Sequence, residues 1–329
     1  MNSSRADPEV GIVILNWNNI ELTNELLKSV RMVDYPRKHI YVVDNGSENE
    51  EGAHLRKTWA PMITLIQNPT NVGFAKGANI GVLHALTDSC ELVLLINNDT
   101  IVDPLFLRNL VRVMINAPRI AIAGPLVLSF ESPDRVLSAG GGIDFKRARA
   151  RLLGQGELKD EYLSMRPFDT EYVSGACMLV RASVFRKVGL LPEQYFAYFE
   201  ETEFCTRVIR NGYRVVVAPC SFIWHHSDNP SLRKLPSRDK LMMRNRVLFL
   251  IRNGRLSQSL SFFVAFAPFE FGSSLVSLVL KGRTPFEATT SLLRGLLSGI
   301  AAAVRNPRGE GMPAYDSSRA ESNVIREAD

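Results

Sequence analysis

Short apolar runs alternate with segments of helical periodicity between residues 10 and 115. The runs have the length of buried strands, and the segments between them repeat apolar residues at the spacing of amphipathic helices. Strands are expected at 10–15, 40–43, 63–66 and 92–96, and helices at 22–33, 75–86 and 105–115. Because alternating strands and helices require crossover connections, the pattern predicts an α/β fold with a mainly parallel sheet.

Polar residues directly follow three of the four expected strands. Residues 16–19 (Asn-Trp-Asn-Asn) follow the first strand, 44–47 (Asp-Asn-Gly-Ser) the second, and 97–99 (Asn-Asn-Asp) the fourth. Ligands bind at the carboxyl ends of the strands in open α/β sheets. We therefore expect these polar groups to line one shared cleft.

The polar residues after the fourth strand carry candidate metal chemistry. Asp99 is a hard oxygen ligand in a position suited to a divalent cation, which would neutralise a phosphorylated substrate. Asn, Asp and Thr are also the usual residues of turns and helix caps, so Asn98-Asp99-Thr100 could equally be a turn with a cap. Spacing alone leaves both interpretations open.

Two further segments fit the binding of a nucleotide. Asp44, directly after a strand, can accept hydrogen bonds from a base or ribose, although an Asx turn with Gly46 is the alternative. In the segment 71–79 (NVGFAKGAN), Gly73 permits close approach at a helix start, and Lys76 lies one turn into that helix. Helix N-termini attract anions, so a pyrophosphate could bind here.

Beyond residue 127 the pattern predicts a second set of elements. The segment 138–156 has the composition of a loop or hairpin, 172–180 (YVSGACMLV) that of a strand, and 213–218 that of another strand. A helix is expected at 199–211, with Gly212 as its stop. Trp224, His225 and His226 follow the last strand; paired histidines near an acid can ligate a metal, but histidines near a tryptophan are as often structural.

Three carboxylates, Glu200, Glu201 and Glu203, lie at the start of the helix expected at 199–211. Acids in a first turn stabilise a helix through its dipole, which would account for some of them. One could instead be a general base, which needs reach to a substrate hydroxyl more than an unusual pKa. No Ser/His/Asp order, zinc spacing or Walker-type loop is present.

Composition is that of an ordinary globular protein. The chain has 329 residues, 46% hydrophobic and 22% charged, enough for one large domain with an appendage. Its cysteines form no CxxC pair and are expected to be small core residues in a reducing compartment; they are Cys90, Cys177, Cys205 and Cys220. No secretory signal is evident at the N-terminus, so we expect a cytosolic protein or one on the cytosolic membrane face.

The C-terminal region combines a basic block with apolar segments. Between Arg233 and Arg255 there are eight Lys or Arg residues and one acid, within a chain of net charge +5. Such a block could face phosphate, nucleic acid, an anionic membrane or solvent; nucleic acid is disfavoured because stacking aromatics are not interleaved. The apolar stretch 256–280 and the leucine stripe of 292–300 favour an interfacial segment, with an ordinary packed helical subdomain as the alternative.

Six segments occur in an order that resembles the inverting family 2 glycosyltransferases, and a WHH follows them. They are VILNWNN, VVDNGS, NPTNVGFAKGAN, LLINNDT, VSGACMLV and YFEETEFCTRV. The resemblance covers about residues 10–227 and implies the nucleotide-diphosphosugar transferase (GT-A) fold, with a Rossmann-like sheet. The domains would be a disordered start (1–8), a catalytic domain (9–230), a basic, amphipathic membrane-associating region (231–307) and a disordered tail (308–329).

The resemblance implies roles for the strand-end residues. Asn16, Asn18 and Asp44 would line the nucleotide pocket, and the segment from Gly73 to Asn79, with Lys76, would flank the sugar-nucleotide. Asn97-Asn98-Asp99 occupies the position of the family's DxD motif, with Asn97 in place of its first acid. Asp99 would therefore bind Mg²⁺ or Mn²⁺ through the donor diphosphate. The family's late histidine ligand falls on His225, with His226 unresolved.

The resemblance also implies a reaction. The family's catalytic Glu-Asp pair falls on Glu200 and Glu201, so Glu201 is the expected base, with Glu200 second. The layout is most similar to rhamnosyltransferase-type enzymes of cell-surface polysaccharide assembly, partly through the segment Arg244-Asn245-Arg246. This implies a dTDP- or UDP-sugar donor, a lipid-linked glycan acceptor and contact with an anionic membrane on the cytosolic side. A homodimer is a further expectation, whereas nucleic acid is not an expected partner.

Two other classes remain as alternatives. A nucleotidyltransferase that makes sugar-nucleotides usually has a glycine-rich, basic loop after its first strand, where this chain has Asn-Trp-Asn-Asn. A catalytically dead sugar-nucleotide-binding protein would not need carboxylates at both Asp99 and Glu201.

Overall fold

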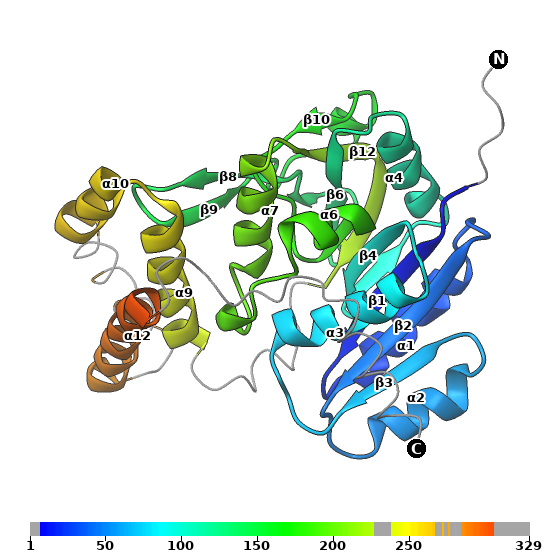
Figure 1. Cartoon of the computed structure of the whole chain (residues 1–329), viewed down its shortest axis with the longest axis horizontal. Helices are drawn as coiled ribbons and strands as arrows, with labels where there is room; N and C mark the ends of the chain where they lie inside the picture. Colours follow the sequence, from blue (N-terminus) through cyan, green and yellow to red (C-terminus); the bar gives the residue numbers. More distant parts are fainter. Residues whose placement is uncertain are drawn as a thin grey trace.

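One mixed sheet forms the centre of the molecule, and helices cover both of its faces (Figure 1). The computed structural model describes residues 7–226, 238–266, 272, 276, 280 and 284–305. The predicted tail 308–329 lies outside the described residues, as do most of the predicted start 1–8 and parts of the region 231–307. Pro8, within that predicted start, is buried, and its carbonyl accepts a hydrogen bond from Tyr35 Oη at 2.6 Å.

The first half of the sheet is parallel, in the order β4-β1-β2-β3. Its strands are β1 (Val10–Asn16), β2 (Lys38–Asn45), β3 (Thr64–Asn68) and β4 (Leu92–Asn97). The helices of this half are α1 (Ile20–Arg31), α2 (Glu51–Trp59) and α3 (Phe74–Thr87). The strands and two of the helices confirm the predictions within two residues; α2 was not predicted, because only Leu55 and Trp59 supply its large buried apolar side chains.

The second half of the sheet is mixed, and continues beyond β4 in the order β11-β6-β12-β10. β11 is antiparallel to both of its neighbours, whereas β12 is parallel to β6. The strands are β5 (Thr100–Val102), β6 (Ile120–Ser129), β7 (Val136–Ser138), β10 (Phe168–Asp169), β11 (Cys177–Arg181) and β12 (Arg214–His225). The α/β class is confirmed, but the expectation of a mainly parallel sheet describes only the first half and the β6–β12 pair.

Two of the predicted strands have different limits. The segment 172–180 becomes a strand only at Cys177, since Ala176 N donates to Ser174 Oγ at 3.2 Å and a turn precedes the strand. The strand predicted at 213–218 continues to His225, because β6 and β5 both pair with its second half across an irregularity near Pro219.

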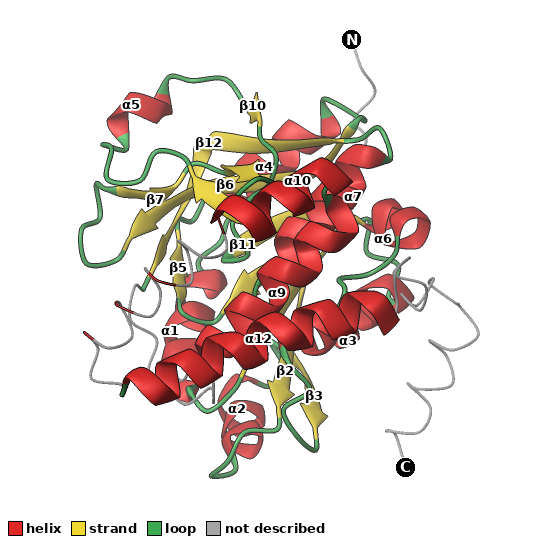
Figure 2. Ribbon diagram, turned by 90° about the vertical axis from the view of Figure 1, so that its left-hand side faces the viewer, coloured by secondary structure: helices red, strands yellow, loops and turns green. Residues whose placement is uncertain are grey.

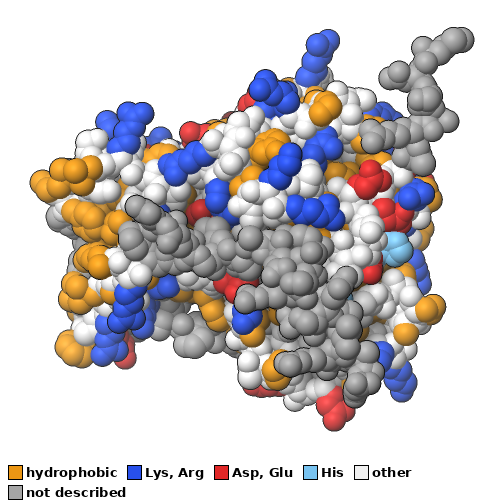
Figure 3. All heavy atoms as spheres, in the orientation of Figure 1, with side chains coloured by type: hydrophobic (Ala, Val, Ile, Leu, Met, Phe, Trp, Pro, Cys, Tyr) orange, Lys and Arg blue, Asp and Glu red, His pale blue; other side chains and the backbone are white. Residues whose placement is uncertain are grey.

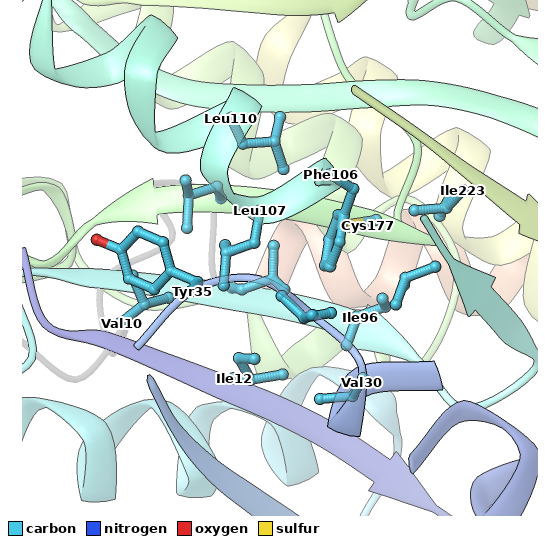
Figure 4. Close-up of a cluster of buried hydrophobic side chains, with 14 of the residues drawn as sticks. Val10, Ile12, Val30, Tyr35, Ile96, Phe106, Leu107, Leu110, Cys177 and Ile223 are labelled. Carbon is cyan, nitrogen blue, oxygen red and sulfur yellow. The ribbon is translucent and has the colours of Figure 1, made fainter. Parts of the chain in front are cut away.

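Alternating side chains of the strands enter two cores. Ile12 and Ile14 of β1 face the helices α1, α2 and α4 (Phe106–Ile115), while Val13 faces α3, α6 (Ala182–Val188) and α7 (Glu200–Arg210). Figure 4 shows the first core, where Phe106 and Leu107 of α4 lie over the sheet. Three cysteines are buried as predicted, but Cys220 is exposed, which corrects that prediction.

The C-terminal helices pack on a small hairpin beside the main sheet. The hairpin, β8 (Gly141–Asp144) and β9 (Arg149–Leu152), confirms the loop or hairpin expected at 138–156. The helices are α9 (Arg238–Asn253), α10 (Leu256–Ser261), the π-helical turn η2 (Phe262–Phe266) and α12 (Pro285–Arg305); α5 (Asp160–Leu163) and the 3₁₀ turn η1 (Glu193–Tyr195) precede them. Figures 1 and 2 show α9 and α12 side by side.

Close packing between α9 and α12 depends on two glycines. A Cβ at Gly295 would lie 2.6 Å from Lys240 O, and one at Gly299 would lie 2.6 Å from Arg244 O.

Part of the basic block between Arg233 and Arg255 is structural. The buried Arg246 donates to Ala148 O at 3.1 Å and to Arg147 O at 2.8 Å. None of the helices within the described residues is both long enough and apolar enough to cross a bilayer.

Candidate active site

Three predicted strand-end residues meet in one hydrogen-bond network at the edge of the sheet. Asn16 Nδ2 donates to Asp44 Oδ1 at 3.1 Å. Thr23 Oγ1 donates to Asn16 Oδ1 at 2.6 Å, and Asn98 Nδ2 donates to Thr23 Oγ1 at 2.9 Å. All four side chains are buried. The expectation that the ends of β1, β2 and β4 converge is therefore confirmed. We call Asn16, Thr23, Asp44 and Asn98, together with Glu51, which bonds to Asn16, the donor-side network, after the sugar-nucleotide donor that the sequence predicts here.

Glu51 and Thr23 are members of this network that the sequence did not reveal. Glu51 Oε2 accepts hydrogen bonds from Asn16 Nδ2 at 2.9 Å and from Asn19 N at 3.1 Å. Thr23 lies on the buried stripe of α1 otherwise formed by leucine and valine, and this polar interruption was the available signal. Glu51 begins the unpredicted helix α2. Asn18, a predicted site residue, joins the same edge through its backbone N–H, which donates to Ser47 Oγ at 2.9 Å.

The glycine segment before α3 is held by Asn45. Its Nδ2 donates to Asn71 Oδ1 at 3.0 Å, and its Oδ1 accepts from Val72 N at 3.2 Å. Gly73 has φ +88°, and a Cβ there would lie 2.5 Å from the Phe196 ring, so only glycine fits. Lys76 is exposed in the first turn of α3, a position compatible with its predicted contact to phosphate.

Asn79 has a different environment from the one predicted. Its Nδ2 donates to Leu191 O at 2.9 Å and to Glu193 Oε1 at 3.1 Å, and its Oδ1 accepts from Leu191 N at 3.0 Å. The side chain is 1% exposed. Both the nitrogen and the oxygen of the Asn79 amide are hydrogen-bonded within the protein. Asn79 therefore holds the loop after α6, and its amide is not available for the predicted contact with the sugar-nucleotide.

Asp99 lies beside His225 at the end of β4. Asn98 and Asp99 form the turn between β4 and β5, and pairing of β5 with β12 places His225 opposite Thr100. His225 Nε2 is 3.1 Å from Asp99 Oδ1, and Asp99 is 2% exposed. The turn interpretation of this segment is therefore correct, but the helix-cap part is wrong, because the next helix begins at Phe106.

The two histidines differ in their surroundings. His226 donates its backbone N–H to Asp99 O at 3.0 Å, but its ring lies 3.8 Å from the Phe130 ring and its Nε2 is 3.7 Å from Glu25 Oε2. Only His225 directs a ring nitrogen at the Asp99 carboxylate. Among the two, His225 is therefore the one placed to share a cation with Asp99.

The helix start with three acids lies close to this strand end. Asn97 N donates to Ala176 O at 3.0 Å, and a Cβ at Gly175 would lie 3.5 Å from Glu201 Cγ. The segment Gly175-Ala176 thus contacts both the end of β4 and the Glu201 side chain. The predicted base therefore lies near the strand that leads into Asp99.

Burial sets the acid strength of the pair Glu200 and Glu201. Burial raises the pKa of Glu200 well above its usual value, and the charge of Glu201 raises it further. Burial also raises the pKa of Glu201, but the Thr202 hydroxyl, which donates to Glu201 Oε1 at 2.9 Å, opposes the shift. Glu200 Oε2 is buried and has no hydrogen-bond partner among the residues that the structure describes. Glu201 is therefore the member of the pair that ionises more readily.

The third acid is structural. Glu203 Oε2 forms a buried ion pair with Arg207 Nη2 at 3.1 Å, one turn along α7. Arg207 also donates to Val188 O at 2.5 Å and to Leu190 O at 2.7 Å, which fixes the end of α6. The sequence favours a helix-dipole role for some of these acids, and the structure shows that Glu203 forms an ion pair instead. The catalytic assignment of Glu201 stays a prediction.

The chain is similar in sequence to two named sugar transferases. The chain is 27% identical over 258 residues to the low-salt glycan biosynthesis hexosyltransferase Agl10 of Haloferax volcanii, covering 77% of this chain and 78% of that protein. A 79-residue stretch, 24% of this chain and 26% of the relative, is 32% identical to the N-acetylglucosaminyl-diphospho-decaprenol L-rhamnosyltransferase of Mycobacterium tuberculosis.

The fold has a counterpart among solved structures. The mannosyltransferase PcManGT of Pyrobaculum calidifontis, solved with GDP-Man and Mn²⁺, superposes with a TM-score of 0.57 at 17% identity, covering 92% of this chain and 82% of that one. The model of the family "Glycosyltransferase like family 2" matches residues 8–246. The chain therefore belongs to glycosyltransferase family 2 and is a glycosyltransferase with the GT-A fold.

Proposed function

We propose that the protein transfers a sugar, with inversion, from a nucleoside-diphosphate sugar to a hydroxyl of a lipid-linked acceptor in cell-surface glycan synthesis. Rhamnose from a dTDP- or UDP-linked donor is the first candidate sugar. The observation that carries the proposal is that the segment Gly175-Ala176 contacts both the Glu201 side chain and Asn97, two residues before the Asp99 that pairs with His225. An inverting transfer needs a stabilised leaving group and a base on the attacking hydroxyl.

Donor binding is assigned to the polar edge of the sheet. Asp44 offers carboxylate oxygens where a nucleoside would lie, and the donor-side network holds it in place through Asn16. The exposed Lys76, in the first turn of α3, suits the diphosphate, whereas Phe196 covers Gly73. The GDP-mannose in the complex of the similar mannosyltransferase is consistent with a sugar-nucleotide as donor.

The residues at the end of β4 fit a divalent cation. A buried carboxylate and an imidazole nitrogen approach each other at 3.1 Å, and Asn97 Oδ1 is buried with no hydrogen-bond partner in the described part of the chain. Oxygen and nitrogen ligands of this kind suit Mg²⁺ or Mn²⁺. No cluster of three or more His, Cys, Asp or Glu occurs among the described residues, so the donor diphosphate would supply further ligands. A cation held here would neutralise charge on the departing nucleoside diphosphate.

Glu201 is assigned as the general base. Its raised pKa gives a carboxylate that binds a proton more strongly than an exposed glutamate does. The acceptor hydroxyl would lose its proton to Glu201 as its oxygen attacks the anomeric carbon, and the bond to the diphosphate oxygen would break on the opposite side. One displacement of this kind inverts the configuration.

A donor screen tests the transfer. Release of nucleoside diphosphate would be measured across UDP-, dTDP- and GDP-sugars, with Mn²⁺, with Mg²⁺ and after chelation. We expect release from one nucleotide class that depends on the added cation, and an inverted linkage in the product by NMR. Cation-independent release or a retained configuration would contradict the proposal.

An exposed apolar face on the C-terminal helices supports a membrane-bound acceptor. Leu293, Leu297 and Val304 are exposed on the side of α12 that faces away from α9, and Leu256 and Leu260 are exposed on α10. Figure 3 shows hydrophobic side chains gathered over the end formed by α10 and α12, with basic side chains among them. Arg255, Arg294 and Arg305 are exposed there. We assign an anionic bilayer as the occupant, because exposed cations flank an apolar helix face.

Vesicle flotation tests the membrane contact. Truncation is unsuitable, because Leu248 and Phe249 of α9 belong to a buried cluster. The double variant Leu293→Glu/Leu297→Glu should instead lose flotation with phosphatidylglycerol-containing vesicles, while Met32→Glu/Ile115→Glu, at exposed apolar positions elsewhere, should keep it. Wild-type flotation should weaken with phosphatidylcholine alone. Equal flotation of both double variants would refute the contact.

A further inference from the structure

The loop that leads into α7 has an unusual backbone. Phe196, Tyr198 and Phe199 have φ values of 65°, 72° and 73°, the left-handed region that large side chains rarely adopt. Each such residue costs about 1–3 kcal/mol and persists only where surrounding contacts enforce it. Phe199 is the N-cap residue of α7, and Glu200 and Glu201 follow it directly. The direction of the Glu201 side chain therefore depends on what holds this loop.

Four consecutive carbonyls of the loop are held by donors from two distant helices. Asn245 Nδ2, from α9, donates to Tyr195 O at 2.9 Å, to Ala197 O at 2.8 Å and to Tyr198 O at 2.8 Å. The intervening carbonyl, that of Phe196, accepts from Ala75 N of α3 at 3.2 Å. The strained segment is therefore fixed between the start of α3 and the middle of α9.

The side chain of Asn245 is itself held in place. It is fully buried, and its Oδ1 accepts from Arg244 Nη1 at 2.6 Å, which orients the amide so that Nδ2 points at the loop. Leu248 and Phe249, on the next turn of α9, pack with Tyr195 and Phe199 of the same loop. With no exposed surface, Asn245 cannot touch a substrate, so any effect on the reaction must pass through the loop.

We propose that Asn245 is a positioning residue for Glu201, holding the strained loop in the conformation that directs the Glu201 carboxylate to the acceptor hydroxyl. This assignment rests on the proposed function of Glu201 as base. Without the Asn245 amide, the Tyr195, Ala197 and Tyr198 carbonyls lose their bond to Nδ2, and the left-handed residues can relax. A displacement of the base by about 1 Å is enough to cost on the order of 10²-fold in rate.

Kinetics of Asn245→Ala and Asn245→Asp test the proposal in the full chain. We expect kcat to fall by about 10²-fold, with KM for the donor and calorimetric affinity for nucleoside diphosphate nearly unchanged. The matched controls are Asn109→Ala and Asn109→Asp, since Asn109 on α4 also donates to a backbone carbonyl, Cys220 O at 2.7 Å. These controls should keep wild-type kcat. An unchanged kcat in a folded Asn245 variant would overturn the assignment.

A double-variant comparison separates positioning from a general loss of structure. In the Glu201→Gln background, Asn245→Ala should lower the residual rate little further, because the group it positions is already absent. A full multiplicative loss would overturn the assignment, since it would show an effect not carried by Glu201. Hydrogen exchange supplies a second measurement: amides of residues 197–203 should exchange faster in Asn245→Ala, and unchanged exchange would also overturn it.

The same experiments distinguish this inference from the proposed function. If the wild type turns over and Glu201→Gln does not, but Asn245→Ala equals the wild type, the base assignment stands and the positioning role is wrong. If Glu201→Gln turns over like the wild type, the base assignment fails, and the positioning role fails with it.

Discussion

The donor side and the base side of the site hold their polar groups in different ways. On the donor side, Asn16, Thr23 and Asn98 are linked by hydrogen bonds in regular strand and helix surroundings. On the base side, three left-handed aromatic residues precede two buried glutamates, and no described residue forms a hydrogen bond with Glu200 Oε2. The first region is stabilised by its own polar contacts, while the second is held in an unfavourable state by the helices packed around it.

This difference corresponds to the two proposed tasks. A donor pocket needs fixed hydrogen-bonding groups, which a satisfied network supplies at little cost in free energy. A general base needs a raised pKa, and the raised pKa comes from burial, which destabilises the folded protein. Substitutions that break the donor-side network should therefore lower the stability of the folded protein, whereas removing a buried glutamate charge on the base side should raise it. The two sets of substitutions should also differ in their effect on rate.

The largest effect is expected from Glu201→Gln. Loss of the base should lower kcat by about 10²- to 10⁴-fold, with calorimetric affinity for nucleoside diphosphate unchanged. Glu203→Gln is the control: it breaks the buried pair with Arg207, so it should lower the midpoint of thermal unfolding while the folded fraction keeps its rate. A near-wild-type rate for Glu201→Gln would show that the base lies elsewhere.

Asp99→Ala should have the next largest effect. Loss of the carboxylate beside His225 should weaken Mn²⁺-dependent donor binding on the order of 10²-fold, since a metal contact supplies several kcal/mol of charge stabilisation. Isothermal titration with and without Mn²⁺ measures the change. Asp103→Ala, which removes only the acceptor of the Leu105 N–H, should bind as the wild type does. Equal cation dependence in both variants would remove Asp99 from the metal site.

Thr23→Val tests whether the donor-side network is stabilising. Valine keeps the shape but leaves Asn16 Oδ1 without its donor and Asn98 Nδ2 without its closest acceptor, so the free energy of unfolding should fall by about 1–3 kcal/mol. Denaturant unfolding measures it. Thr87→Val, at an exposed helix position, should change it by less than about 0.5 kcal/mol. Similar losses in both variants would mean that the network adds no stability of its own.

Glu200→Gln should have the smallest effect of these substitutions, and it should raise the stability of the folded protein where Thr23→Val lowers it. Because burial raises the pKa of Glu200 in the folded protein, the folded state binds more protons than the unfolded chain above the usual glutamate pKa. Stability due to this group therefore falls as the pH rises through the raised pKa. The Glu200→Gln variant should unfold at the same temperature as the wild type at about pH 4, and at a higher temperature than the wild type at neutral pH. A destabilised variant at neutral pH would contradict this account of the base side.

Much of the donor side could be predicted from the sequence. Parallel strands bring their carboxyl ends to one edge, so the polar residues after β1, β2 and β4 had to lie close together once the apolar runs were recognised as strands. Asn16, Asp44 and Asn98 meet for this reason. The pairing of Asp99 with His225 was expected from the resemblance alone, because no local pattern relates two residues so far apart in the chain.

The base side was less predictable. Glu200, Glu201 and Glu203 look alike in the sequence, and only the Arg207 ion pair and the contact with Gly175 separate their roles. Asn79 was expected to contact the donor, but it bonds Leu191 and Glu193 instead. Asn245 belongs to a segment that the sequence marked by its basic residues and by the family resemblance, with no role for the amide itself. Its three carbonyl acceptors belong to a loop about fifty residues earlier.

The sequence by itself determined the parallel strands β1–β4, the helices α1, α3, α4 and α7, the family and the set of polar residues at the sheet edge. It could do so because periodicity and strand-end position are local properties. Tertiary structure alone decided which histidine faces Asp99, which glutamate forms the ion pair with Arg207 and what holds the strained loop before α7. Those outcomes depend on burial and on contacts between distant segments, which set pKa values and backbone conformation and leave no mark in local periodicity.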